Sequence, residues 1–206
     1  MHPRTFPKSA KGIPIDKEVL QADSSTKRKE STNVLETLYI GMHNINGIKS
    51  RVAKMDFLVD YMVEHNLDIV GLCETNLGER EGKYTCRKFE GFKAFWSETE
   101  ADKNKGSGVG LIVREKWAEH VSRVKSSCPY ILEVLFTFKQ IDIECLVIYQ
   151  APNNPNVENK VLATIKDKMQ EYKGKKPRHY IVLGDLNQVV ESEKDRKGKG
   201  KVGIKS

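Results

Sequence analysis

Apolar and polar positions divide the chain into an irregular N-terminal stretch and a regular body. Residues 1–36 contain no sustained periodicity, so we expect them to be mostly disordered. From Leu38 onward, short apolar runs alternate with segments of helical spacing. Residues 194–206 are basic and have no periodic apolar face. The pattern therefore predicts a disordered segment at 1–36, a folded portion at 37–193 and a flexible tail at 194–206.

Several apolar runs have the length and composition of β-strands. They cover residues 38–44, 67–74, 106–113, 130–138, 141–149 and 180–183. The run at 67–74 is mostly apolar, which is typical of a strand covered on both faces. Only Lys139 and Gln140 separate the runs at 130–138 and 141–149, which predicts a β-hairpin.

Two segments place apolar residues at helical spacing. The stripe in residues 51–66 consists of Val52, Met55, Leu58, Val59, Met62 and Val63. The stripe in residues 157–174 consists of Val157, Val161, Ile165, Met169 and Tyr172, with Gly174 as the expected C-terminal cap. We interpret both stripes as core packing. Helices that alternate with strands and include one hairpin predict an α/β fold with a mixed sheet.

The composition indicates a polar, intracellular protein. Apolar residues make up 38% of the chain and charged residues 31%, and no run approaches the roughly 18 apolar residues of a membrane span. The N-terminus has no apolar core of a secretory signal. The cysteines are far apart and form no CxxC pair, so we expect reduced thiols rather than a zinc site or a disulfide framework.

The positive charge is concentrated toward the two ends of the chain. Of the net charge of +7, residues 1–36 carry +2 and residues 188–206 carry +3, which leaves +2 for the body. A basic excess favours a phosphate-bearing partner such as nucleic acid. A solvated, flexible tail explains the C-terminal charges equally well.

Polar residues follow four of the predicted strands at the point where each strand ends. They are Asn44 and Asn46, Glu74, Tyr149 and Asn153, and Asp185 and Asn187. Taken singly, most of these are ordinary turn residues. Ligand sites, however, tend to form at strand ends, where a rigid scaffold meets its loops. Two carboxylates with several amides suit a hard divalent cation such as Mg²⁺.

Four short motifs carry a family resemblance. "HNINGI" at 43–48, "CETNL" at 73–77, "YQAPNN" at 149–154 and "LGDLNQ" at 183–188 resemble, in order, the first motifs of the endonuclease/exonuclease/phosphatase superfamily. The wording is most similar to the endonucleases of non-LTR retrotransposons, and the likeness covers about residues 37–200. It implies a deoxyribonuclease I-like four-layer sandwich of mixed β-sheets flanked by helices. It also implies phosphodiester hydrolysis that depends on Mg²⁺ or Mn²⁺.

The resemblance also implies a role for each motif residue. Glu74 and Asn46 would contact the metal ion. Asn44 would hold the phosphate or the water, and the Tyr149 hydroxyl would bond a phosphate oxygen. Asn153 would shape the loop on the substrate side.

Asp185 would activate or orient the attacking water, with Asn187 as its partner. Phosphodiester hydrolysis needs such a group, together with a metal ion and donors around the phosphorus. The family closes its site with a late Ser-Asp-His motif, and no histidine follows Asn187 in this sequence. His43 and His179 lie in or beside predicted strands and are expected to be packing or edge residues. We therefore expect the second half of the domain to be missing and this chain to show little nuclease activity alone.

Three functions follow from these observations. The first is a metal-dependent phosphodiesterase that acts on nucleic acid. The second is a non-catalytic fragment that binds nucleic acid or a partner. A phosphoesterase for inositol phosphates or lipids is a weaker alternative. An open reading frame that continues into a Ser-Asp-His motif would separate the first from the second.

Overall fold

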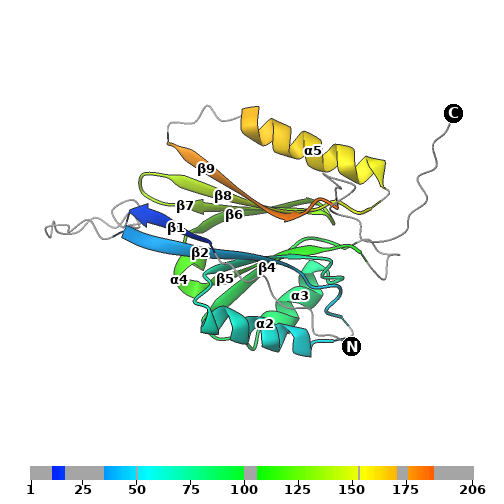
Figure 1. Cartoon of the computed structure of the whole chain (residues 1–206), viewed down its shortest axis with the longest axis horizontal. Helices are drawn as coiled ribbons and strands as arrows, with labels where there is room; N and C mark the ends of the chain where they lie inside the picture. Colours follow the sequence, from blue (N-terminus) through cyan, green and yellow to red (C-terminus); the bar gives the residue numbers. More distant parts are fainter. Residues whose placement is uncertain are drawn as a thin grey trace, which may run out of the picture.

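Two β-sheets packed face to face form the centre of the molecule (Figure 1). The computed structural model describes residues 11–16, 35–49, 51–99, 106–152, 154–170 and 176–187. Helices α2 and α3 lie on the outer side of one sheet, and α5 covers the outer side of the other (Figure 1). This arrangement confirms the expected α/β sandwich with four layers. None of the helices in these ranges is long and apolar enough to cross a membrane.

Sheet 1 contains the first five strands in the order β1-β2-β3-β5-β4. Their bounds are Lys11–Asp16 for β1, Leu35–Asn44 for β2, Ile69–Cys73 for β3, Phe92–Trp96 for β4 and Val109–Arg114 for β5. Strands β2 and β3 are parallel, and the other neighbours are antiparallel. All five residues of β3 are buried, which confirms a strand covered on both faces.

Sheet 2 contains the remaining strands in the order β6-β7-β8-β9. Their bounds are Val121–Cys128 for β6, Ile131–Thr137 for β7, Asp142–Tyr149 for β8 and Arg178–Asp185 for β9. The predicted hairpin joins β7 to β8, and the Phe138 N–H donates to the Ile141 carbonyl at 3.0 Å across its turn. Strands β8 and β9 are parallel, so sheet 2, like sheet 1, is mixed.

The helices are α2 (Ala53–Glu64), α3 (Glu79–Cys86), α4 (Glu115–Ala118) and α5 (Pro155–Gln170). In α2 the predicted stripe is correct at its centre, where the residues are buried. It is wrong at its two ends, because Val52 is 44% exposed and Val63 is 52% exposed. Val52 precedes the first residue of α2, and Val63 is exposed although its neighbour Met62 is buried, so periodicity alone overestimates which residues are buried.

Helix α5 shows the same overestimate more strongly. Val157 and Val161 are buried and Ile165 is partly buried against the core, whereas Met169 is 80% exposed. Tyr172 and Gly174 lie outside the described residues. Apolar burial in α5 therefore decreases along the helix, from Val157 and Val161 through Ile165 to Met169.

One strand departs from the expected N-terminal disorder. Residues 11–16 form β1, which pairs antiparallel with β2 so that Ile13 lies opposite Leu38. Pro14 has no N–H to donate, and an edge strand tolerates this because one of its sides has no neighbour among the described strands. The prediction of disorder is therefore wrong at residues 11–16 and 35–36. The rest of 1–36, and the tail at 194–206, lie outside the described residues.

Three elements had no strong sequence signal. Helix α3 buries only Gly82, and a Cβ atom there would come within 2.5 Å of the Trp96 ring. Strand β6 has exposed residues along most of its length. Strand β4 was not among the apolar runs that predicted strands, and only Trp96 in it is fully buried. Elements with so few buried apolar residues show no clear period, which explains why the pattern missed them.

Candidate active site

The four motif-bearing strands all end on the same side of the molecule. Asn44 is the last residue of β2, opposite Cys73 in the parallel β3, and Glu74 follows directly. Tyr149 ends β8 opposite Asp185, which ends the parallel β9. Each sheet therefore contributes one pair of adjacent parallel strand ends, and each pair carries one carboxylate.

The side-chain amide of Asn44 connects the two carboxylates. Its Nδ2 donates to Glu74 Oε1 at 2.7 Å and to Asp185 Oδ2 at 3.2 Å. Its Oδ1 accepts the backbone N–H of Asn46 at 3.1 Å. Asn44 is therefore fixed by three hydrogen bonds, and it joins a group from sheet 1 to a group from sheet 2.

Tyr149 is 3% exposed and lies beside this pair. Burial raises the pKa of its hydroxyl above the ordinary range, and a hydrogen bond to Glu74 with the charges of Glu74 and Asp185 raises it further. A hydrogen bond from Asn187 acts in the opposite direction and is the smaller effect. The hydroxyl consequently stays protonated at neutral pH and is a hydrogen-bond donor in the site.

Asn187 fixes the turn that follows β9. Its backbone N–H donates to Asp185 Oδ1 at 2.9 Å, and its Nδ2 donates to the Gln150 carbonyl at 2.8 Å. The Gln150 N–H in turn donates to the Asp185 carbonyl at 2.9 Å. Asp185 thus has a hydrogen bond on each carboxylate oxygen, one from Asn187 and one from Asn44.

Positive φ angles gather at these strand ends. Glu74 has a φ of 53°, which is uncommon for a residue with a long side chain, and Asn46 and Asn187 have φ angles of 49° and 48°. Asparagine tolerates this region better than glutamate does. The left-handed backbone at Glu74 is a local strain, and strain of this kind occurs preferentially at functional sites.

Two glycines allow the sheets and strands to come together beneath the site. A Cβ atom on Gly71 of β3 would lie 3.0 Å from Leu183 of β9. A Cβ atom on Gly184 would clash with the Ile148 carbonyl of β8. Gly184 directly precedes Asp185, so the break in the apolar run of β9 is a position where β8 leaves no room for a side chain.

Cys73 lies under the carboxylates but is not suited to nucleophilic catalysis. It is completely buried, and its Sγ donates to the Ile148 carbonyl at 3.2 Å. Burial, with smaller contributions from the charges of Asp185 and Glu74, raises the pKa of the thiol to about 12. The cysteine therefore remains a neutral thiol that packs between the sheets.

The other predicted residues are placed differently. The Asn46 side chain is exposed at the rim, and Asn153 lies outside the described residues. His43 and His179 lie within β2 and β9, opposite Leu72 and Ile143. Neither histidine occupies a strand end beside the carboxylates.

The sequence interpretation missed the contribution of the segment at 106–108. The Ser107 carbonyl accepts the Asn76 N–H at 2.9 Å, and the Gly108 carbonyl accepts the Thr75 N–H at 3.0 Å. A Cβ atom on Gly106 would lie 3.9 Å from the Tyr149 hydroxyl. Gly106 and Gly108 have φ angles of 76° and 80°, which glycine adopts readily. The glycines that precede β5 in the sequence were therefore the signal that this segment comes close to the site.

The donor set of the site fits a hard divalent ion. Glu74 and Asp185 supply carboxylate oxygens, and the asparagines supply amide oxygens. This agrees with the ligands of Mg²⁺ in proteins, which are typically one or two carboxylates together with water and substrate phosphate. Within the described part of the chain, no group of three or more His, Cys, Asp or Glu side chains has an arrangement that could hold a metal ion by itself. The site therefore suits Mg²⁺ or Mn²⁺ better than a softer metal that prefers nitrogen and sulfur ligands.

The sequence profile of the Endonuclease/Exonuclease/phosphatase family matches residues 43–200, and the chain belongs to this family. No curated protein sequence matches the chain.

Solved structures with a similar fold include two nucleic-acid enzymes and a sugar phosphatase. D. rerio TDP2 complexed with a single-strand DNA product is 18% identical over 74% of this chain and 61% of its own, with a TM-score of 0.52. AP endonuclease LMAP from Leishmania major is 14% identical over 72% of this chain and 54% of its own, with a TM-score of 0.56. The mannosyl-6-phosphatase Bt3783 of Bacteroides thetaiotaomicron is 15% identical over 73% of this chain and 65% of its own, with a TM-score of 0.52. The chain spans between about half and two-thirds of these structures, and the likeness concerns the fold.

Proposed function

We propose that this chain carries the metal-binding and water-activating side of a divalent-metal-dependent phosphodiester hydrolase that acts on nucleic acid. The observation that supports this most directly is the Asn44 amide, bonded to Glu74 from one sheet and to Asp185 from the other. A buried, protonated Tyr149 hydroxyl lies beside them. Two carboxylates in separate roles, with a neutral donor between them, match the needs of phosphoryl transfer to water.

Glu74 would hold Mg²⁺ or Mn²⁺, with Asn46 at the rim as a second contact. When bound, the ion supplies positive charge against the phosphoryl oxygens. The strained backbone of Glu74 aims its carboxylate toward Asn44, so the position of this ligand is fixed before any ion binds.

Asp185 would act on the attacking water. Asn187 and Asn44 hold its two oxygens, and each oxygen retains a lone pair that can accept a proton from the water. As the new oxygen–phosphorus bond forms, the ester bond on the opposite side of phosphorus breaks and the leaving oxygen takes a proton from solvent. The Tyr149 hydroxyl, which stays protonated, donates a hydrogen bond to a non-bridging phosphate oxygen.

The assignment of nucleic acid as the substrate rests on three observations. D. rerio TDP2 has been crystallised with a single-strand DNA product, and the Leishmania protein is an AP endonuclease. The motif wording resembles the non-LTR retrotransposon endonucleases, and the chain carries a net charge of +7. A non-catalytic nucleic-acid-binding role is the second candidate, because the sequence contains no Ser-Asp-His motif.

Metal binding and cleavage should be measured separately. The first experiment records Mn²⁺ binding by electron paramagnetic resonance for the wild-type chain and for Glu74→Gln. Glu79→Gln, which removes an exposed carboxylate on α3, is the matched control. Loss of Glu74 should weaken Mn²⁺ binding at least tenfold. Losing a residue that only orients a metal ligand already costs roughly this much, so losing a direct ligand should cost no less. Equal binding by all three proteins would contradict the metal site.

The second experiment measures plasmid nicking with Mg²⁺ by the same three proteins. Nicking that is abolished by Glu74→Gln and retained by Glu79→Gln supports the hydrolase. Mn²⁺ binding that depends on Glu74, without nicking by the wild type, supports the non-catalytic role of this chain.

A further inference from the structure

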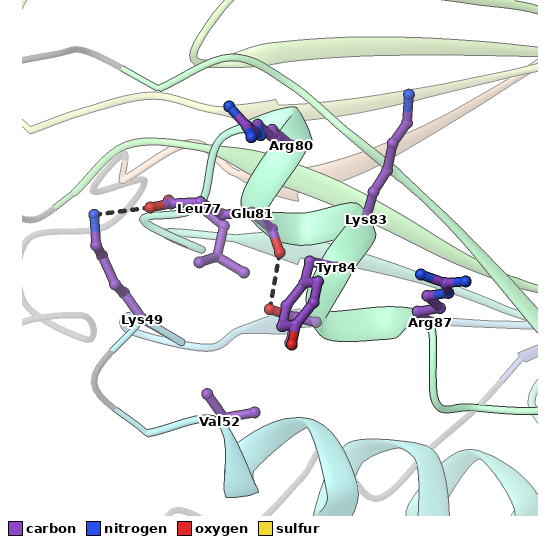
Figure 2. A pocket seen from close by; sticks show the side chains of 9 residues that line it. Lys49, Val52, Leu77, Arg80, Glu81, Lys83, Tyr84 and Arg87 are labelled. Carbon is purple, nitrogen blue, oxygen red and sulfur yellow. Dashed lines mark hydrogen bonds and ion pairs between the residues drawn. The ribbon is translucent and has the colours of Figure 1, made fainter.

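A basic pocket lies between the start of α2 and one side of α3 (Figure 2). It has a volume of about 760 Å³. Lys49 and Val52 line it from the segment before α2, and Leu77 lines it from the loop after β3. The rest of the wall is α3, so we call it the α3 pocket.

Positive charge dominates the lining of the α3 pocket. Its cationic residues are Lys49, Arg80, Lys83 and Arg87, and its only acidic residue is Glu81. The side chains of Arg80 and Arg87 form no ion pair or hydrogen bond with any residue in the described ranges, whereas Lys49 pairs with Glu81 at 3.0 Å. Two arginines are therefore available to a ligand, and arginine binds phosphate in a bidentate manner.

The pocket also contains an exposed aromatic ring. Tyr84 is 81% exposed, and its ring stands between α3 and Val52 at the mouth of the pocket (Figure 2). An aromatic ring among cationic side chains is the combination with which proteins bind single-stranded nucleic acid, since the ring stacks on a base while the cations follow the backbone. A base that is paired within a duplex cannot stack on such a ring.

The pocket continues directly from the strand ends that carry the candidate active site. Lys49 follows Asn46 by three residues, and Leu77 follows Glu74 by three residues. The two loops run together, because the Gly47 N–H donates to the Glu74 carbonyl at 2.6 Å. A strand whose phosphate lies beside Glu74 can therefore extend along these loops into the α3 pocket.

We propose that the α3 pocket binds an unpaired nucleotide of a nucleic-acid strand, on one side of the phosphate that lies in the active site. Arg80 and Arg87 contact its flanking phosphates, and Tyr84 stacks on its base. This inference rests on the proposed function for the position of the strand. The binding of single-stranded nucleic acid by the pocket does not itself require cleavage.

The test measures binding of a fluorescent single-stranded oligonucleotide to the 206-residue chain by anisotropy, with EDTA present so that no cleavage occurs. Tyr84→Ala should weaken binding about 5- to 150-fold, the loss of one stacked base, and Tyr84→Phe should bind as the wild type does. Phe57→Ala, which removes an aromatic ring that is 68% exposed on α2, is the matched control and should have no effect.

The charges are tested by the salt dependence of the same binding. Arg80→Gln with Arg87→Gln should lower the slope of log affinity against log salt by about 1.4, the value for two phosphate contacts on a single strand. Glu81→Gln, which frees Lys49, should tighten binding by about 2- to 5-fold, since an exposed ion pair is weak. Lys166→Gln on the exposed face of α5 is the control.

The outcomes distinguish this inference from the proposed function. The proposal for the α3 pocket is overturned if the Tyr84→Ala variant and the arginine double variant both bind with wild-type affinity. It is also overturned if a duplex of the same sequence binds more tightly than the single strand. Glu74→Gln should bind the oligonucleotide at least as well as the wild type. If Glu74→Gln leaves metal binding and nicking unchanged while the pocket variants lose affinity, the proposed function fails and the pocket stands.

Discussion

Helices α2 and α5 cover the outer faces of the two sheets by different physical means. Helix α2 inserts Met55, Leu58 and Met62 against sheet 1, and each is at most 1% exposed. Helix α5 buries Val157 and Val161 in its first half and packs Ile165 only partly, and its C-terminal part is also held to sheet 2 through Lys168. One helix is anchored by apolar contact along its length and the other by apolar contact at one end and charge at the other.

The charged anchor lies on the outer face of β7 and β8. Lys168 Nζ contacts Glu133 at 2.8 Å and Glu144 at 3.0 Å, and the two carboxylates are 2% and 0% exposed. Arg123 and Arg178 also reach Glu144, at 3.1 and 3.2 Å. Buried ion pairs add little net stability, but the loss of one partner is strongly destabilising. The stability of the α5 side therefore depends on complete charge pairing, whereas the stability of the α2 side depends on the volume that its apolar side chains fill.

The largest expected effect is the loss of the charged anchor. Lys168→Met should lower the free energy of unfolding by about 3 to 5 kcal/mol, because Glu133 and Glu144 lose their shared cation inside the protein. Urea denaturation measures the change. Lys166→Met, at an exposed position of the same helix, should be nearly neutral, and adding Glu133→Gln to Lys168→Met should recover part of the loss. A change below about 0.5 kcal/mol in Lys168→Met would contradict the role of this network.

Truncation on the α2 side should have the next largest effect. Met55→Ala should lower the free energy of unfolding by about 2 to 5 kcal/mol, because it leaves a cavity in a fully buried cluster. Met169→Ala is the matched methionine control, since Met169 is 80% exposed on α5. Similar losses in the two variants would mean that the α2 interface is not the packed layer described above.

The acid side of the pH profile should distinguish the two interfaces. Burial acts to raise the pKa of Glu133, but the hydrogen bond and charge of Lys168 and the charge of Lys125 outweigh it and hold the pKa below its ordinary value. The stabilisation is therefore present above the unfolded-state pKa of about 4.3 and is lost as the pH falls through the lower folded-state value. Glu133→Gln should be less stable than the wild type at pH 7, and the difference should shrink toward pH 3.

The smallest effect concerns the ends of the α2 stripe. Val63→Ala should change the free energy of unfolding by no more than about 0.5 kcal/mol, since Val63 is 52% exposed despite its helical spacing. Val59→Ala, four residues earlier and 8% exposed, should be more destabilising. Thermal or urea unfolding of the two variants would show whether burial or periodicity decides the contribution of each valine.

The strands and helices with a strong apolar period could be predicted from the amino-acid sequence. The apolar runs of β3, β7 and β8 are almost wholly buried, and they were visible because burial on both faces selects apolar residues at every position. The four strand-end motifs could be recognised in the sequence for a different reason. In each motif the turn and ligand residues follow the strand in a fixed local order. Fold class and family therefore followed from information that is local in the chain.

Which of the predicted residues contact one another could not be predicted from the sequence, because it depends on how distant elements pack. Asn44 bonds Asp185 across 141 positions of sequence, because the two sheets pack with Gly71 against Leu183. The left-handed backbone of Glu74, the approach of Gly106 to Tyr149 and the basic wall of α3 have no periodic signature. Periodicity records how a residue meets its own sheet or helix, whereas these contacts depend on how separate elements pack, and that is set by the whole core at once.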